Sequence, residues 1–294
     1  MNAELAERGF RVARDADAHF LPFPYPYRWP LGRAEGASEG ALALVRHALD
    51  DPASGIGPVA AIVVEPVQGN GGVVIPPDGF LHGLRDVCDR HGVVLVFDEI
   101  QAGFGRTGRL WAAEHWGVVP DLITMAKGLT SAYVQLGALG MRRKYAEHFE
   151  NNVFYGGLTY NSHPLACATA LATIQVYEDE ALLERATRMG ERMKVYHEQL
   201  AARHPSVGAV RNIGLFGIVE LVRNRETMEP MAPFNGTSDE MAALGKFFRQ
   251  EGLYTFVRWN YFFTNPPLVI SEEEMAEGFE IIDRALEITD AAIA

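Results

Sequence analysis

Two short apolar runs, each ending near a charged residue, constrain the fold of this chain more than any other feature. The first run covers residues 93–97 and is followed directly by Asp98 and Glu99, whereas the second covers residues 122–125 and leads to Lys127. A continuous apolar run bounded by turn residues is typical of a strand buried on both faces of a parallel sheet. Ligands of open α/β sheets bind beyond the carboxyl ends of such strands. We therefore expect Asp98 and Lys127 to lie on the same rim of a sheet.

A carboxylate and a lysine on one rim are the groups that pyridoxal phosphate chemistry requires. The lysine forms a Schiff base with the cofactor's aldehyde, and the acid keeps the pyridine nitrogen protonated so that the ring acts as an electron sink. Each residue also has a simpler interpretation when it is taken alone. An acid at a strand end is often a helix cap or an ion-pair partner, and a Lys-Gly pair often marks the end of a helix.

The order of motifs around these residues resembles the signature of class III pyridoxal-phosphate aminotransferases. An apolar strand is followed by Asp-Glu-Ile, two further residues, Gly-Phe-Gly-Arg-Thr-Gly at 103–108, Pro-Asp at 120–121, a short strand and the lysine. The resemblance runs through almost the whole chain. It implies a fold-type-I α/β architecture, with a mostly parallel sheet in a large cofactor-binding domain (residues 1–172) and a smaller α+β domain (residues 173–294).

The composition and net charge restrict the kinds of binding partner and the cellular compartment that we expect for this protein. The net charge of −12 argues against a nucleic-acid groove or an anionic membrane surface as the main partner. No apolar stretch is long enough to span a bilayer, and the first residues lack the apolar core of a secretion signal. Cys88 and Cys167 have no partner spacing, which is typical of buried thiols in a reducing cytoplasm. No histidines pair at ligand spacing, so no metal site is expected.

The remaining pattern predicts elements that fit an α/β fold. The order strand, helix, strand without hairpin signals indicates βαβ units and a parallel sheet. The proline-rich segment 19–32 predicts an edge or irregular strand, and Ser271 followed by Glu274 predicts a helix capping box. Helices are expected near residues 38–49, 80–91 and 272–288, a long helix is expected to start at about residue 163, and helical sequence continues over 181–205; strands are expected near residues 59–64, 136–141, 210–222 and 253–263.

The resemblance assigns roles to four residues of a cofactor site. Asp98 would contact the pyridine nitrogen, and Gln101 would donate to the phenolic oxygen, although a solvent-facing turn residue is the simpler interpretation of Gln101. Lys127 would bind the aldehyde and later move the Cα proton as a general base, for which its free pKa of ~10.4 must be lowered. Thr159 matches the threonine that reaches the cofactor phosphate of a neighbouring subunit, which implies a homodimer with shared sites.

Two further residues are candidates for the substrate side of the site. Glu65 ends its own strand on the same rim as Asp98, and in family members the corresponding glutamate pairs with an arginine over the substrate. Arg258 is the candidate receiver of a carboxylate or sulfonate, because its planar fork can bind an acid bidentately. A second interpretation, in which Arg258 bridges the two domains, stays open.

One part of the family pattern has no counterpart in residues 1–58. Family members carry, before a Pro-Tyr-Arg stretch, a Gly-Ser/Thr turn that binds most of the cofactor phosphate and an aromatic residue that stacks on the pyridine ring. We therefore expect a large domain that is incomplete at its N-terminal side, as in a truncated gene product, a proteolysed or internally initiated form, or a natural split protein. Each charge-assisted hydrogen bond to the phosphate is worth ~1.5–3 kcal/mol, so several losses weaken cofactor binding by orders of magnitude.

The resulting functional prediction is transfer of an amino group from an amine or ω-amino acid to a 2-oxo acid such as pyruvate. The segment Leu-Tyr-Thr-Phe-Val-Arg-Trp-Asn at 253–260 is most similar to taurine–pyruvate and β-alanine-type members. Two alternatives remain open. The first is an aminomutase, racemase or decarboxylase of the same fold, and the second is a non-catalytic module that keeps the fold for assembly or regulation.

Overall fold

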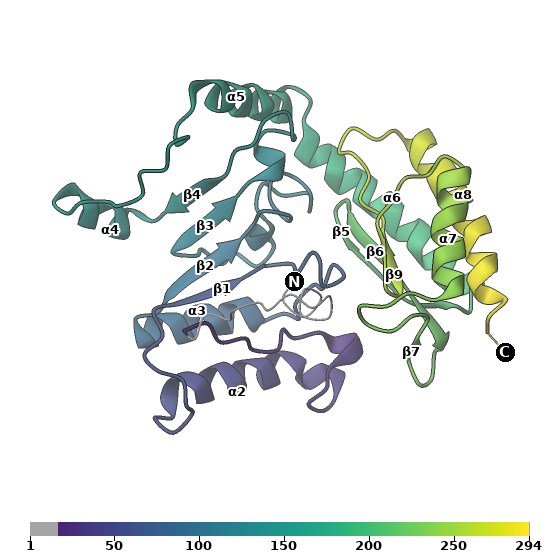
Figure 1. Cartoon of the computed structure of the whole chain (residues 1–294), viewed down its shortest axis with the longest axis horizontal. Coiled ribbons are helices and arrows are strands. Elements are labelled where there is room, and N and C mark those ends of the chain that lie inside the picture. The colour runs from purple at the N-terminus through teal and green to yellow at the C-terminus, as the bar shows by residue number, and fades with distance from the viewer. Residues whose placement is uncertain (1–16, 294) are drawn as a thin grey trace.

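The computed structural model describes residues 17–293 as two lobes, each built on its own sheet (Figure 1). The sheet of the first lobe has four strands in the order β1-β2-β3-β4. Strands β1 to β3 are parallel and β4 is antiparallel to β3. The strands are β1 (Ala61–Val64), β2 (Val94–Asp98), β3 (Leu122–Met125) and β4 (Ala138–Met141).

Helices α2 (Ala37–Asp50) and α3 (Phe80–His91) cover one face of this sheet (Figure 1). Helix α3 buries a stripe of apolar residues at helical spacing and ends at Gly92, whose φ of 66° is left-handed. The opposite face of β1 is open, and the side chain of Val63 is 67% exposed. The apolar runs of β2 and β3 are those expected to be buried on both faces. The centre of β2 is buried as expected, whereas all four residues of β3 are only half-buried.

The expected βαβ order holds for β1, α3 and β2 but not beyond them. Between β2 and β3 the chain forms the glycine turn and the short helix η3 (Ala112–His115). The strand expected at 136–141 is present, but it runs antiparallel to its neighbour. The segment 19–32 forms the short helix η1 (Pro26–Arg28) instead of a strand, because Pro26 fixes the first φ of that turn.

In the second lobe, helices pack against a second sheet. The strands of this sheet are in the order β5-β6-β9-β8, and β7 pairs with β6. The piece expected as one strand over 210–222 is a hairpin, which turns at Gly214 with a φ of 55°. The capping box of α8 is confirmed, since the hydroxyl of Ser271 accepts from the amide of Glu274 at 3.1 Å. Helix α5 (Pro164–Asp179) packs on the first lobe and leads into the second. The elements of the second lobe are α6 (Leu182–Arg203), β5 (Val207–Ile213), β6 (Phe216–Asn224), β7 (Glu229–Pro230), α7 (Asp239–Gln250), β8 (Val257–Arg258), β9 (Tyr261–Phe263) and α8 (Glu272–Asp290).

Four short helices complete the described chain: η2 (Ala34–Gly36), η4 (Lys127–Leu129), α4 (Arg143–Ala146) and η5 (Glu147–Glu150). The segment that carries α4 projects away from both lobes before the chain returns to α5 (Figure 1). The division into domains at 172/173 remains a prediction, and it falls within α5. In residues 17–293, no helix has both the length and the apolar character needed to cross a membrane.

The two lobes meet through a shared apolar cluster near the carboxyl ends of β1 and β2. Val67, Val73 and Ala102 of the first lobe pack with Phe216 and Tyr261 of the second. The half-buried side chain of Arg106, in the glycine turn, adds hydrogen bonds to the carbonyls of Leu215 and Pro266 in the second lobe. The rim that we expected to bind a ligand therefore faces the junction between the lobes.

Candidate active site

The register of β2 and β3 places the two predicted residues beside each other at the sheet rim. Asp98 is paired with Thr124, and the amide of Glu99 donates to the carbonyl of Thr124 at 3.0 Å. Lys127 follows two residues after the last residue of β3. The half-buried carboxylate of Asp98 accepts the amide hydrogen of Ile100 through Oδ1, at 3.0 Å.

The backbone of Lys127 is held in an unusual conformation. Its φ is 45°, in the left-handed region, at the start of the short helix η4 (Lys127–Leu129). Gly128 packs so closely on Phe104 that an added Cβ would lie 2.6 Å from the Cβ of Phe104. The hydroxyl of Tyr177 also donates to the carbonyl of Gly128 at 3.2 Å. A left-handed non-glycine residue costs about 1–2 kcal/mol, and such strain concentrates at functional sites.

Glu65 shares this electrostatic environment. Its Oε2 accepts the amide hydrogen of Gly69 at 2.8 Å. Burial raises the pKa of Glu65, the Gly69 hydrogen bond opposes that rise, and the charges of Asp98 and Lys127 act on it in opposite directions. The structure therefore brings Glu65, Asp98 and Lys127 together, as two carboxylates and one amine at the ends of β1, β2 and β3.

Gln101 lies beside this group of charges. Its carboxamide fills the space next to Gly69, where an added Cβ would lie 2.1 Å from Oε1 of Gln101. Gln101 and Asn70 also line a cavity of about 470 Å³ that extends into the second lobe, where its walls include Phe256 and Phe263. A loop glycine thus allows the predicted cofactor residue to sit against the loop that carries Glu65.

The two acids that end β2 have different surroundings. The side chain of Glu99 is completely buried and accepts the amide hydrogens of Ala112 and Ala113 at 3.0 and 2.8 Å. Burial raises the pKa of Glu99 to about 7. Glu99 therefore holds the backbone that follows the glycine turn. Of the two acids, Asp98 is the one that lies with Glu65 and Lys127.

The other two predicted residues lie elsewhere. Thr159 occupies an exposed turn between η5 and α5. Arg258 lies in β8 with its guanidinium 4.2 Å from the ring centre of Trp259. Its strand partner Tyr261 donates its hydroxyl hydrogen to the carbonyl of Asn70 at 2.7 Å, so β9, the strand paired with β8, contacts the loop that follows Glu65.

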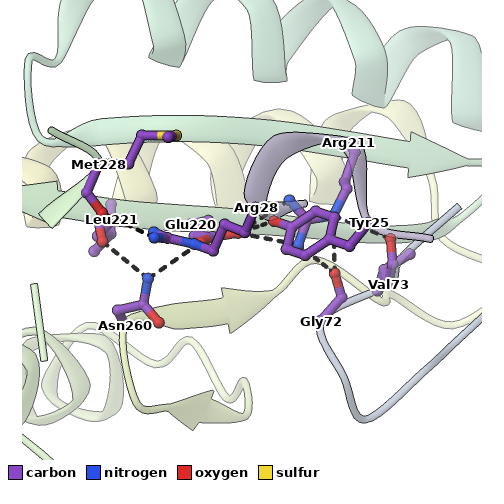
Figure 2. Close-up of polar contacts among 9 residues, drawn as sticks. All are labelled: Tyr25, Arg28, Gly72, Val73, Arg211, Glu220, Leu221, Met228 and Asn260. Carbon is purple, nitrogen blue, oxygen red and sulfur yellow. Dashed lines mark hydrogen bonds and ion pairs between the residues drawn. The ribbon is translucent and has the colours of Figure 1, made fainter. Parts of the chain in front are cut away.

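The sequence did not reveal a polar cluster behind that same loop. Tyr25 and Arg28 meet Arg211 and Glu220 of the second lobe around one buried carboxylate (Figure 2). The Pro-Tyr-Arg stretch was visible as a motif, but nothing in the sequence indicated its partners, which lie about two hundred residues away.

The family of the chain follows from comparison with known proteins. The family model described as aminotransferase class-III matches residues 8–286. The chain belongs to the class-III aminotransferase family. Family members of known structure share its fold, so the α/β architecture expected from the sequence is confirmed.

Individual family members match most of this chain but are considerably longer. An adenosylmethionine-8-amino-7-oxononanoate aminotransferase of Geobacter sulfurreducens is 36% identical and covers 88% of this chain, which spans 58% of that protein. An omega-aminotransferase of Caulobacter vibrioides is 40% identical, with shares of 78% and 51%. The taurine:2-oxoglutarate aminotransferase of Bifidobacterium kashiwanohense, solved with PLP and glutamate, superimposes with a TM-score of 0.83 at 34% identity, with shares of 88% and 58%.

Proposed function

We propose that this chain carries the pyridoxal-phosphate site of an aminotransferase that moves an amino group from an amine or ω-amino acid to a 2-oxo acid such as pyruvate. The observation that carries the proposal is the convergence of Glu65, Asp98 and the strained Lys127 at one sheet rim. The omega-aminotransferase relative and the PLP-bound taurine aminotransferase structure support the same reaction and cofactor.

The donor set at the rim fits pyridoxal phosphate. Lys127 would hold the aldehyde carbon, Asp98 the pyridine nitrogen and the amide of Gln101 the phenolic oxygen. When it is bound, the cofactor supplies an electron sink for the bonds at the substrate's Cα. The carboxylate of Asp98 would favour a cationic ring nitrogen by its charge. The amine of Lys127 would act as the general base that takes the Cα proton of the substrate.

One of the two proposed substrate-binding residues comes from the second lobe and the other from the first. Arg258 would receive a carboxylate or sulfonate of the donor, with Glu65 as its counter-charge over the site. Support comes from the strand partner of Arg258, Tyr261, which bonds to Asn70 in the loop that carries Glu65. The alternative role of Arg258, as a bridge between the lobes, rests on the same contact.

The assembly that fits this site is a cytoplasmic homodimer with shared sites. The segment around Thr159 exposes an unusual number of large apolar side chains, and surfaces of that kind mark protein interfaces. A partner subunit on this segment would bury them and bring Thr159 to the partner's cofactor phosphate. The exposed side chains are Val153, Phe154, Tyr155, Leu158, Tyr160, Leu165 and Leu171.

The half-reaction tests the proposed function. The chain is saturated with pyridoxal phosphate, freed of excess cofactor and mixed with taurine or β-alanine without an acceptor. We expect about one oxo product per Lys127-containing site, after which the reaction stops until pyruvate is added. The product is quantified by trapping its aldehyde with a hydrazine.

The alternatives give different results in the same assay. When the assay is run with alanine as the donor, a racemase yields the opposite enantiomer and a decarboxylase releases CO₂, whereas with β-alanine an aminomutase yields α-alanine, in each case without oxo product. A non-catalytic module gives neither product at any cofactor concentration. Any of these three results contradicts the proposed transamination.

Mixing two variants tests the shared site. We expect Lys127→Ala to remove the covalent link, and Thr159→Ala to weaken cofactor affinity by roughly tenfold, because one charge-assisted hydrogen bond of ~1.5–3 kcal/mol is lost. In mixed dimers, one site regains both residues. The two variants are mixed, unfolded and refolded together, and the absorbance of bound cofactor is measured at a cofactor concentration at which Thr159→Ala alone binds poorly. The absorbance of the mixture should exceed that of either variant alone. A mixture no better than the sum of its parts contradicts the shared site.

A further inference from the structure

The loop after Glu65 is closed on itself by backbone hydrogen bonds. The first and last residues of the 68–74 turn bond to each other in both directions, at 3.0 and 2.9 Å. The amide of Val73 donates to the carbonyl of Gly69 at 3.0 Å, and the amide of Gly69 donates to the carboxylate of Glu65 at 2.8 Å. Because these bonds are linked in series, a displacement at the far end of the turn is transmitted to the Glu65 carboxylate.

Arg211 of β5 holds the far end of this turn. Its Nε donates to the carbonyls of Gly72 and Val73 at 2.9 and 3.1 Å, and a terminal nitrogen donates to Gly72 at 2.5 Å (Figure 2). Val73 has a φ of 47°, which a β-branched residue adopts only under strain. Bonds to two consecutive carbonyls stabilise this conformation against relaxation.

Glu220 of β6 holds Arg211 in turn. Its Oε2 accepts from both terminal nitrogens of Arg211, at 3.1 and 3.2 Å, and it also accepts the hydroxyl of Tyr25. Its Oε1 accepts from Arg28 at 2.6 Å (Figure 2). Burial acts to raise the pKa of Glu220, but the charge of Arg211 and the other donors outweigh it and lower the pKa, so the carboxylate stays ionised.

The planar guanidinium of Arg211 makes contacts in this cluster that a positive charge without that shape would not make. The planar fork of Arg211 bonds to a carboxylate and to two carbonyls at the same time, whereas a lysine is a point charge without that geometry. A buried ion pair is a poor source of stability, since the desolvation of its charges offsets much of their attraction. The cluster therefore serves to fix the position of the 68–74 turn more than to stabilise either lobe.

We propose that Arg211, oriented by Glu220, is a positioning residue that sets the Glu65 loop and the adjoining Gln101 carboxamide at the cofactor site. Gly69 is the link, because its amide binds Glu65 and its Cα faces Gln101. The inference rests on the proposed function for its chemical meaning. Its physical content, the placement of residues 65–70 by a side chain of the other lobe, is tested without that function.

The test compares Arg211→Lys and Arg211→Met with a matched control, Arg223→Met. Arg223 lies on β6 and pairs with Glu240 at 2.8 Å, so the control also breaks an arginine–glutamate pair of the second lobe. Amide hydrogen exchange is measured on the full chain without cofactor. We expect exchange in peptides covering 65–70 to accelerate about tenfold in both Arg211 variants and to stay unchanged in the control.

A second readout concerns the cofactor. Pyridoxal phosphate is titrated against each protein, and the pH at which the bound cofactor's absorption changes is recorded. We expect the Arg211 variants to bind about tenfold more weakly and to shift that pH, with wild-type behaviour in Arg223→Met. A shift of the pH midpoint reports a change around the cofactor that a general loss of stability does not produce.

The outcomes separate this inference from the proposed function. If the wild-type chain gives no cofactor band that depends on Lys127, the proposed function fails and hydrogen exchange alone decides the inference. Unchanged exchange at 65–70 in a folded Arg211 variant overturns it. Arg211→Lys keeps the charge opposite Glu220, so failure of that variant to fold also overturns the inference by showing a purely structural requirement.

Discussion

Replacing Lys127 with alanine is expected to abolish the absorption band of protein-bound pyridoxal phosphate while the chain remains folded. The reason is chemical, because the band requires a covalent bond between the cofactor and a lysine amine placed at the sheet rim. The measurement is an absorption titration of purified protein, followed by borohydride reduction and peptide mapping of the labelled lysine. Lys194→Ala, at an exposed position on α6, controls for reaction with surface amines.

The backbone of Lys127 adds a second expectation to the same series. A φ of 45° is unfavourable for any residue with a Cβ and natural for glycine. Lys127→Gly should therefore raise the free energy of unfolding by about 1 kcal/mol, measured by urea denaturation, while it also removes the band. Retention of the band in either Lys127 variant, at the amplitude of the control, would refute the assignment.

Local sequence patterns were sufficient to predict most elements of the fold. The helix over 80–91 and the strand over 122–125 occur with the expected bounds, because each carries an uninterrupted period and clear end signals. The direction of β4 was not predictable, since an apolar run of that length has no signal for parallel or antiparallel pairing. The open face of β1 was also missed, because apolar content says nothing about whether a second layer covers a strand.

The candidate site was predictable where one residue type implies one chemistry. Asp98 and Lys127 follow directly from strand ends, and their convergence with Glu65 is present in the structure. The separate role of Glu99 depended on which way each side chain of the pair points. The polar cluster around Glu220 could not be predicted from local sequence patterns, because Tyr25 and Glu220 are 195 positions apart and no periodicity connects them.

The largest expected effect on stability comes from Asp121, which follows Pro120 in the family motif. Its side chain is fully inaccessible, and its Oδ2 accepts from Arg85 and from the amide of Leu95 at 2.8 and 3.0 Å. Its Oδ1 lies 3.0 Å from the amine of Lys144. Asp121→Asn keeps the shape of the side chain but removes the buried charge that faces Arg85, which then has only the exposed carboxylate of Asp89 as an acidic partner. We expect a loss of about 3–5 kcal/mol in the free energy of unfolding.

The pH dependence of that loss has a definite sign. Burial acts to raise the pKa of Asp121, but the Leu95 amide and the neighbouring cations outweigh it, and the pKa falls well below its usual range. A carboxylate with a depressed folded-state pKa contributes its stability above the unfolded value of about 3.9 and loses it as the pH falls below that value. The difference between wild type and Asp121→Asn should therefore be constant from about pH 5 to pH 7 and shrink below about pH 4.

The other partner of Arg85 provides the matched control. Asp89 pairs with the same guanidinium at 2.8 Å, but its side chain is 59% exposed and screened by water. Asp89→Asn should cost less than about 1 kcal/mol, as exposed pairs do. Urea denaturation of both variants at pH 7 and at about pH 3 makes the comparison. Equal losses for the two variants would show that burial of Asp121 carries no special weight, whereas a large and pH-sensitive loss for Asp121 alone would identify the Pro-Asp motif as the anchor that joins α3, β2 and β3 beneath the site.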